Sequence, residues 1–71
     1  MFIVIELQGN GETVANIVTT HATQAEAESK YHLVLSAAAI SNVPVHAAVM
    51  LSEEGFPMLH QCYKHEATVQ E

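Results

Sequence analysis

A single helical segment with a marked start and a marked end lies in the middle of this chain. Residues 23–26 read Thr-Gln-Ala-Glu, a capping box in which the Thr hydroxyl accepts a backbone N–H and the Glu reaches back to the cap. The Ala-rich run that follows favours a helix, and Val43-Pro44 stops it because the residue before a proline is driven to extended geometry. We therefore predict one helix over Gln24 to Ser41, with only short segments on either side.

The segment before this helix has the pattern of a β-hairpin. Phe2 to Gln8 is rich in β-branched and aromatic residues, and Gly9-Asn10-Gly11 follows it directly. Residues 13–20 are again β-branched and show no helical periodicity. The first hairpin is therefore predicted to turn at residues 9–11.

A second hairpin is expected after the helix. Val45 to Leu51 reads as a third strand, residues 52–55 (Ser-Glu-Glu-Gly) supply a turn, and Phe56 to His65 reads as a fourth strand. Pro57 suits an edge position or the start of a strand, where its missing N–H is tolerated. We expect Glu66 to Glu71 to form a frayed tail.

Together these elements predict one α+β domain, residues 1–71, with the order ββαββ. The crossover through the helix lets the third strand lie antiparallel beside the first, so the expected sheet is antiparallel with strand order 2-1-3-4 and one helix packed on one face. Internal repeats and linkers are absent from the sequence, and 71 residues suffice for one small domain.

Composition excludes several classes of protein. Hydrophobic residues make up 49% and charged residues 14%, which is incompatible with intrinsic disorder. A net charge of −6 argues against binding to nucleic acid or to an anionic membrane. The single Cys62 cannot form an intramolecular disulfide, and no stretch approaches the roughly 20 apolar residues of a membrane span. We expect a cytoplasmic protein.

The predicted fold has more apolar surface than one helix on one sheet can cover. Both faces of the first and third strands are mainly apolar, and the helix has a second apolar stripe beside its main stripe of Ala27, Tyr31, Val34, Leu35 and Ala38. We predict that Ile3, Ile5 and Val49 lie beneath the helix. The opposite sheet face, where Glu6 and Gln8 of the first strand are expected to face water, is predicted to form a homodimer interface. A twisted sheet that shields some of these residues within a monomer is the alternative. The expected interface residues are Phe2, Val4, Met50 and Tyr63, with the helix stripe Leu33, Ala37 and Ile40 as the second candidate.

Candidate catalytic and metal-binding residues do not form a recognisable motif. The five histidines have no metal-ligand spacing, and a two-residue turn at Glu54-Gly55 would place His60 opposite Val49 and His46 opposite Tyr63. His60 and Cys62 share a face about 7 Å apart, which is too far for direct proton transfer. We expect no catalytic residues, no metal and no cofactor.

The N-terminal strand, the helix and the second hairpin together resemble small bacterial proteins of unknown function that are common in phage-derived and mobile elements. The helix matches the form T-x-x-E-A-E-x-x-Y-H at residues 23–32, and the second hairpin matches V-M-L-x-E-E-G-F at residues 49–56. The resemblance covers most of the chain and implies a genetic context without an activity.

The sequence therefore predicts a non-enzymatic, self-associating interaction or structural module, whose partner is another protein. The alternative is an acidic inhibitor that mimics nucleic-acid phosphates and occupies a basic cleft of a protein. The charge permits this, although the eight acidic residues do not form a continuous track in the sequence.

Overall fold

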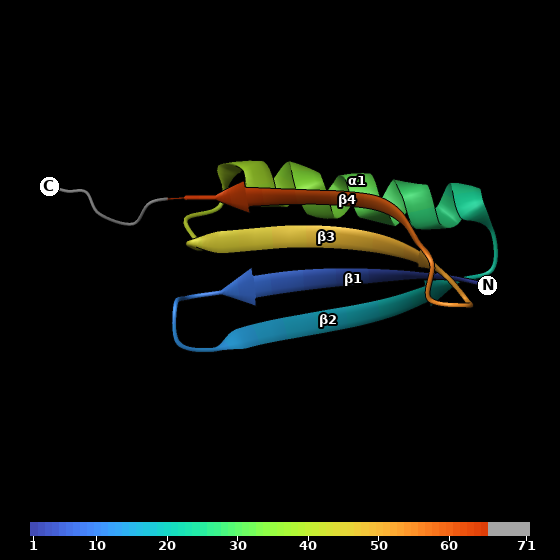
Figure 1. Cartoon of the computed structure of the whole chain (residues 1–71). Coiled ribbons are helices and arrows are strands. Elements are labelled where there is room, and N and C mark those ends of the chain that lie inside the picture. The colour runs from blue at the N-terminus through green and yellow to red at the C-terminus, as the bar shows by residue number, and fades with distance from the viewer. Residues whose placement is uncertain (66–71) are drawn as a thin grey trace, which may run out of the picture.

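The computed structural model describes residues 1–65 and shows one helix packed across a four-stranded sheet (Figure 1). The strand order is β2-β1-β3-β4, and every neighbouring pair is antiparallel. This confirms the predicted ββαββ α+β fold and its strand order. The predicted tail, residues 66–71, lies outside the described residues. The elements are β1 (Phe2–Gly9), β2 (Val14–His21), α1 (Gln24–Ile40), β3 (Val45–Ser52) and β4 (Pro57–Lys64).

The helix begins at the predicted capping box. The Thr23 hydroxyl oxygen accepts the backbone N–H of Glu26 at 3.2 Å, which satisfies one of the donors that a helix start leaves free. At the other end α1 stops at Ile40, one residue before the predicted end, because Ser41 is already extended. Within residues 1–65, no helix is long and apolar enough to span a bilayer.

Both hairpins turn where the sequence predicts. Gly11 and Gly55 have φ angles of 98° and 87°, a region that side chains with a Cβ rarely adopt. In the first turn the Asn10 side-chain oxygen accepts the backbone N–H groups of Glu12 and Thr13, both at 2.9 Å. In the second turn the hydroxyl oxygen of Ser52 accepts two backbone N–H groups. These bonds replace the strand pairing that ends at each turn.

The core lies between α1 and the inner strands β1 and β3. It combines the helix stripe predicted from periodicity with side chains from one face of the sheet, and partly buried residues close its margins. Alanines on both layers let the helix approach the strands closely. The core consists of Val4, Ala27, Tyr31, Val34, Ala48 and Met50, with Phe2, Leu35 and Met58 packed against it.

The predicted assignment of the two sheet faces was wrong. Val4 and Met50 are 1% and 0% exposed beneath the helix, and Phe2 packs against the same core. Tyr63 is half-buried and pairs with the buried His46, so it too belongs to the covered face. These four residues therefore do not form an open interface.

The residues predicted to lie beneath the helix occupy the opposite face. Ile3, Ile5 and Val49 alternate with the buried residues of β1 and β3, so they point away from α1. The second candidate stripe does lie outward, since Leu33 and Ile40 are 65% and 87% exposed and Ala37 is exposed.

Candidate functional site

The face of the sheet that α1 leaves uncovered carries apolar side chains along its whole width. We call it the open face, and Figure 1 shows that α1 covers only the other side. Its apolar residues come from all four strands: β-branched and leucine side chains on β1, β2 and β3, and a cysteine on β4. They are Ile3, Ile5, Leu7, Val14, Val18, Val45, Ala47, Val49, Leu51 and Cys62.

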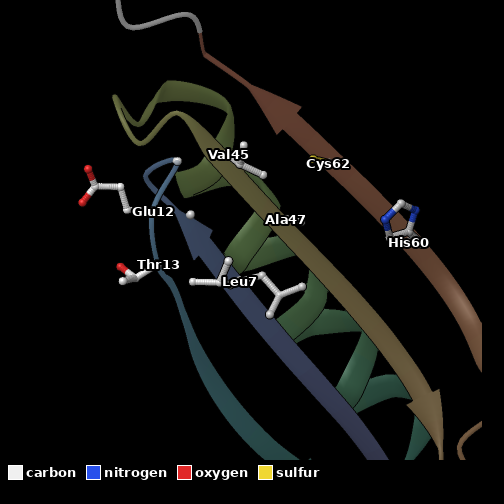
Figure 2. A pocket seen from close by; sticks show the side chains of 10 residues that line it. Leu7, Glu12, Thr13, Val45, Ala47, His60 and Cys62 are labelled. Atoms are coloured by element: carbon white, nitrogen blue, oxygen red, sulfur yellow. The ribbon is translucent and has the colours of Figure 1, made fainter.

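A groove of about 470 Å³ runs across one end of the open face (Figure 2). Small residues account for the hollow, because Gly9 and Ala47 lie between the larger Leu7 and Val45. The turn between β1 and β2 borders one side of the groove with Glu12 and Thr13, and β4 borders the other with His60 and Cys62 (Figure 2). The groove is thus an apolar depression with polar groups only at its margins.

His60 and Cys62 lie on the same strand face, as predicted from the turn. His60 pairs with Val49 and Cys62 pairs with Ala47, so the predicted register of the second hairpin is confirmed. His60 is exposed and Cys62 is half-buried as a free thiol. Over residues 1–65, no group of three or more His, Cys, Asp or Glu side chains is arranged to hold a metal ion.

A second polar cluster, which the sequence reasoning missed, lies on the covered face near the end of α1. His46 is 4% exposed; its Nε2 lies 2.6 Å from Oε2 of Glu6, and its Nδ1 lies 2.9 Å from the hydroxyl of Ser41. The side chain of Gln8 donates to the same Glu6 oxygen at 2.9 Å. We call these four residues the His46 cluster. Glu6 and Gln8 were predicted to face water, and this cluster shows that they face the helix layer.

The bonding within the cluster keeps Glu6 ionised. Burial raises the pKa of the Glu6 carboxyl, but hydrogen bonds from His46 and Gln8 and the positive charges of His46 and Lys30 outweigh it, so the net pKa lies below its ordinary value of 4.5. An ionised carboxylate only accepts, so Nε2 of His46 carries a proton. The cluster is therefore an internally paired acid and base.

Ser41 connects His46 to the last turn of α1. Its hydroxyl lies 2.9 Å from Nδ1 of His46 and 3.3 Å from the carbonyl oxygen of Ala38. The hydroxyl is therefore within hydrogen-bond distance of both the imidazole and the helix end.

A row of Ser, His and Glu is also the pattern of an activated nucleophile. Here the imidazole is almost fully buried, its two nitrogens contact Ser41 and Glu6, and Ser41 itself is half-buried. The cluster joins β1 and β3 to the end of α1, where His65 also reaches the Ala38 carbonyl at 2.8 Å.

The described acidic side chains other than Glu6 gather at the ends of the sheet. Glu26 and Glu28 lie in the first turns of α1, and Glu53 and Glu54 lie in the turn between β3 and β4 at the same end. Glu12 lies in the turn at the opposite end. Among residues 1–65, four acidic side chains thus lie at one end of the sheet and one lies at the other end.

Comparison of the chain with protein-family models, with curated protein sequences and with solved structures gives no match.

Proposed function

We propose that this chain is a self-associating structural module in which two copies pack through their open faces. The observation that carries the proposal is that one helix covers one face of the sheet, while the other face presents apolar side chains from all four strands. In an antiparallel sheet with one solvated face, apolar and polar residues normally alternate along each strand. The residues of β1 and β3 do not alternate in this way, because both of their faces carry apolar residues.

The area of the open face matches what a small dimer interface needs. Strands of eight residues at the usual spacing give the face a flat projection of about 500 Å². The accessible surface of protruding side chains exceeds that projection, and specific interfaces begin near about 600 Å² per partner. Two such sheets would pack about 10 Å apart, with the groove at Gly9 and Ala47 filled by side chains of the partner.

The charge distribution favours a second copy of the chain as the partner that covers the open face. The chain has a net charge of −6, so two copies repel each other over most of their surfaces. Among the described strand residues of the open face none is acidic, since Glu6 points to the helix layer and the other described carboxylates lie in turns or on α1. This face is where identical chains approach with the least repulsion.

Two isoleucine-to-lysine variants test which surface is used. Ile5 lies at the centre of the open face, between Val18 and Val49, so Ile5→Lys would bury an ammonium group between two sheets. Ile40 is 87% exposed on the helix and gives the matched control. Sedimentation of the wild type at micromolar concentration should show a multiple of 7.7 kDa. Ile5→Lys should lower the mass, and Ile40→Lys should leave it unchanged.

Two results would contradict the proposal. A wild type that sediments near 7.7 kDa without concentration dependence does not self-associate. An assembly that Ile40→Lys dissociates and Ile5→Lys does not is held together by the helix stripe instead. Circular dichroism of each variant shows whether the helix and sheet are retained.

A further inference from the structure

The two edge strands of the sheet differ in how readily they could accept another strand. β4 begins with Pro57, which has no N–H, ends with Lys64, and has an irregular register opposite Met50 and Leu51. Each of these features hinders pairing with a further strand. β2 has none of them: its eight residues contain no proline, glycine, lysine, arginine or carboxylate, and they pair with β1 in an unbroken register.

β2 is also exposed on both of its faces. Ile17, on the side of the helix layer, is 52% exposed, and Val18, on the open face, is 54% exposed. The reason is that α1 packs mainly over β3 and β1 and leaves β2 projecting beyond it (Figure 1). The helix therefore does not obstruct a strand that approaches the β2 edge.

We propose that the β2 edge is a strand-docking site and that its occupant is β2 of a second copy. In an edge strand about half of the backbone N–H and C=O groups point away from the sheet, and an antiparallel partner strand would satisfy them. A two-fold axis perpendicular to the sheet, beside the outer edge of β2 at the middle of the strand, makes the strand complementary to itself, with residues of the same face opposite each other. Ile17 then lies close to Ile17 of the other copy, and no charges oppose each other across the pair.

This pairing is independent of the packing of open faces. A two-fold axis perpendicular to the sheet keeps both open faces on the same side of a continuous eight-stranded sheet, so edge pairing does not cover them. Where both contacts form, two extended sheets stack into a tetramer with two kinds of interface.

The lysine variants separate the two contacts. Ile17→Lys places like charges near each other across the proposed pair without altering the open face. We expect a wild-type tetramer, a dimer for both Ile17→Lys and Ile5→Lys, a monomer for the double variant, and an unchanged mass for Ile40→Lys. A wild-type dimer that Ile17→Lys alone splits supports edge pairing and overturns the open-face proposal. A wild-type dimer that Ile5→Lys alone splits overturns edge pairing.

Hydrogen exchange of the wild type tests the docking site without relying on a variant. Backbone amides of β2 that point away from β1 should exchange slowly in the assembled protein and severalfold faster after dilution. Amides of the inner strand β1 provide the internal control, since their partners lie within one chain. Exchange in β2 that is equally fast at high and low concentration would overturn the proposal.

Discussion

The two faces of the sheet differ in the opposite sense to the one expected, because the face covered by the helix is the more polar of the two. The covered face carries Glu6, Gln8 and His46 beside its apolar core, whereas the open face carries mainly isoleucine, valine and leucine. The polar side chains tolerate burial because they bond to one another at the end of α1. The comparison teaches that the helix lies where small side chains and a satisfied polar cluster fit beneath it, not on the more hydrophobic face.

The largest expected effect comes from placing a charge on the covered face. Val4→Glu would put a carboxylate into a site that is 1% exposed, at a cost of more than about 4 kcal/mol, which approaches the whole stability of a small domain. We expect loss of the helical circular dichroism signal. Ile3→Glu, one residue away on the open face, is the matched control and should fold. A folded Val4→Glu protein would mean that β1 presents the opposite face to the helix.

The His46 cluster is the next most sensitive part of the covered face. His46→Ala removes the partner of a part-buried carboxylate and of the Ser41 hydroxyl, so the free energy of unfolding should fall by about 2–3 kcal/mol. Urea denaturation measures this loss. The exposed His60 on the open face gives the control, and His60→Ala should change stability by less than about 0.5 kcal/mol.

A double-mutant cycle shows whether the loss belongs to the pair. The double variant Glu6→Gln, His46→Ala should lose less unfolding free energy than the two single variants lose in sum. The reason is that His46→Ala alone leaves the Glu6 carboxylate without its partner, and Glu6→Gln removes that charge. Strictly additive losses would show that the 2.6 Å contact contributes nothing to stability.

The contrast between the faces also explains what the sequence could predict. The turns at Gly11 and Gly55, the cap at Thr23 and the buried helix stripe depend on residues close together in the chain, and all were predicted correctly. The strand order followed from the single crossover. The register of His60 opposite Val49 was predicted from a two-residue turn, but Leu51 pairs with Pro57 next to the turn, and a register shift between Met50 and Leu51 brings the strands into the predicted pairing.

The choice of face depended on contacts between distant residues. Glu6 and His46 are separated by 40 positions, and no turn connects β1 directly to β3, so their register could not be read from a local pattern. When the contact between Glu6 and His46 is not known, Glu6 and Gln8 indicate that their face of β1 is solvated. The apolar residues Ile3 and Ile5 on the other face then favour placing that face beneath the helix. An acid and a histidine on inner strands of one sheet were the only signal of the cluster.

The helix cap tests how firmly the covered layer holds α1. Thr23→Ala removes the oxygen that accepts the N–H of Glu26, and we expect a loss of about 1 kcal/mol in the free energy of unfolding. Thr23→Ser keeps the hydroxyl and should retain most of that stability. An unchanged denaturation midpoint for the Ala variant would show that packing against the sheet, rather than the cap, sets the start of α1.

The dependence of stability on acid pH is the smallest expected effect, and it tests Glu6 on the covered face specifically. Because the folded pKa of Glu6 lies below its ordinary value of 4.5, the contribution of Glu6 to stability is present above that pH and is lost as the pH falls below it. The free energy of unfolding should therefore fall less in Glu6→Gln than in the wild type between about pH 7 and about pH 3. The exposed Glu53, whose pKa is lowered by its bond to the Met1 ammonium group, contributes to both proteins and cancels. Glu54→Gln, an exposed change in the adjacent turn, should follow the wild-type curve, and a Glu6→Gln curve parallel to the wild type would show that the His46 cluster does not hold Glu6 ionised.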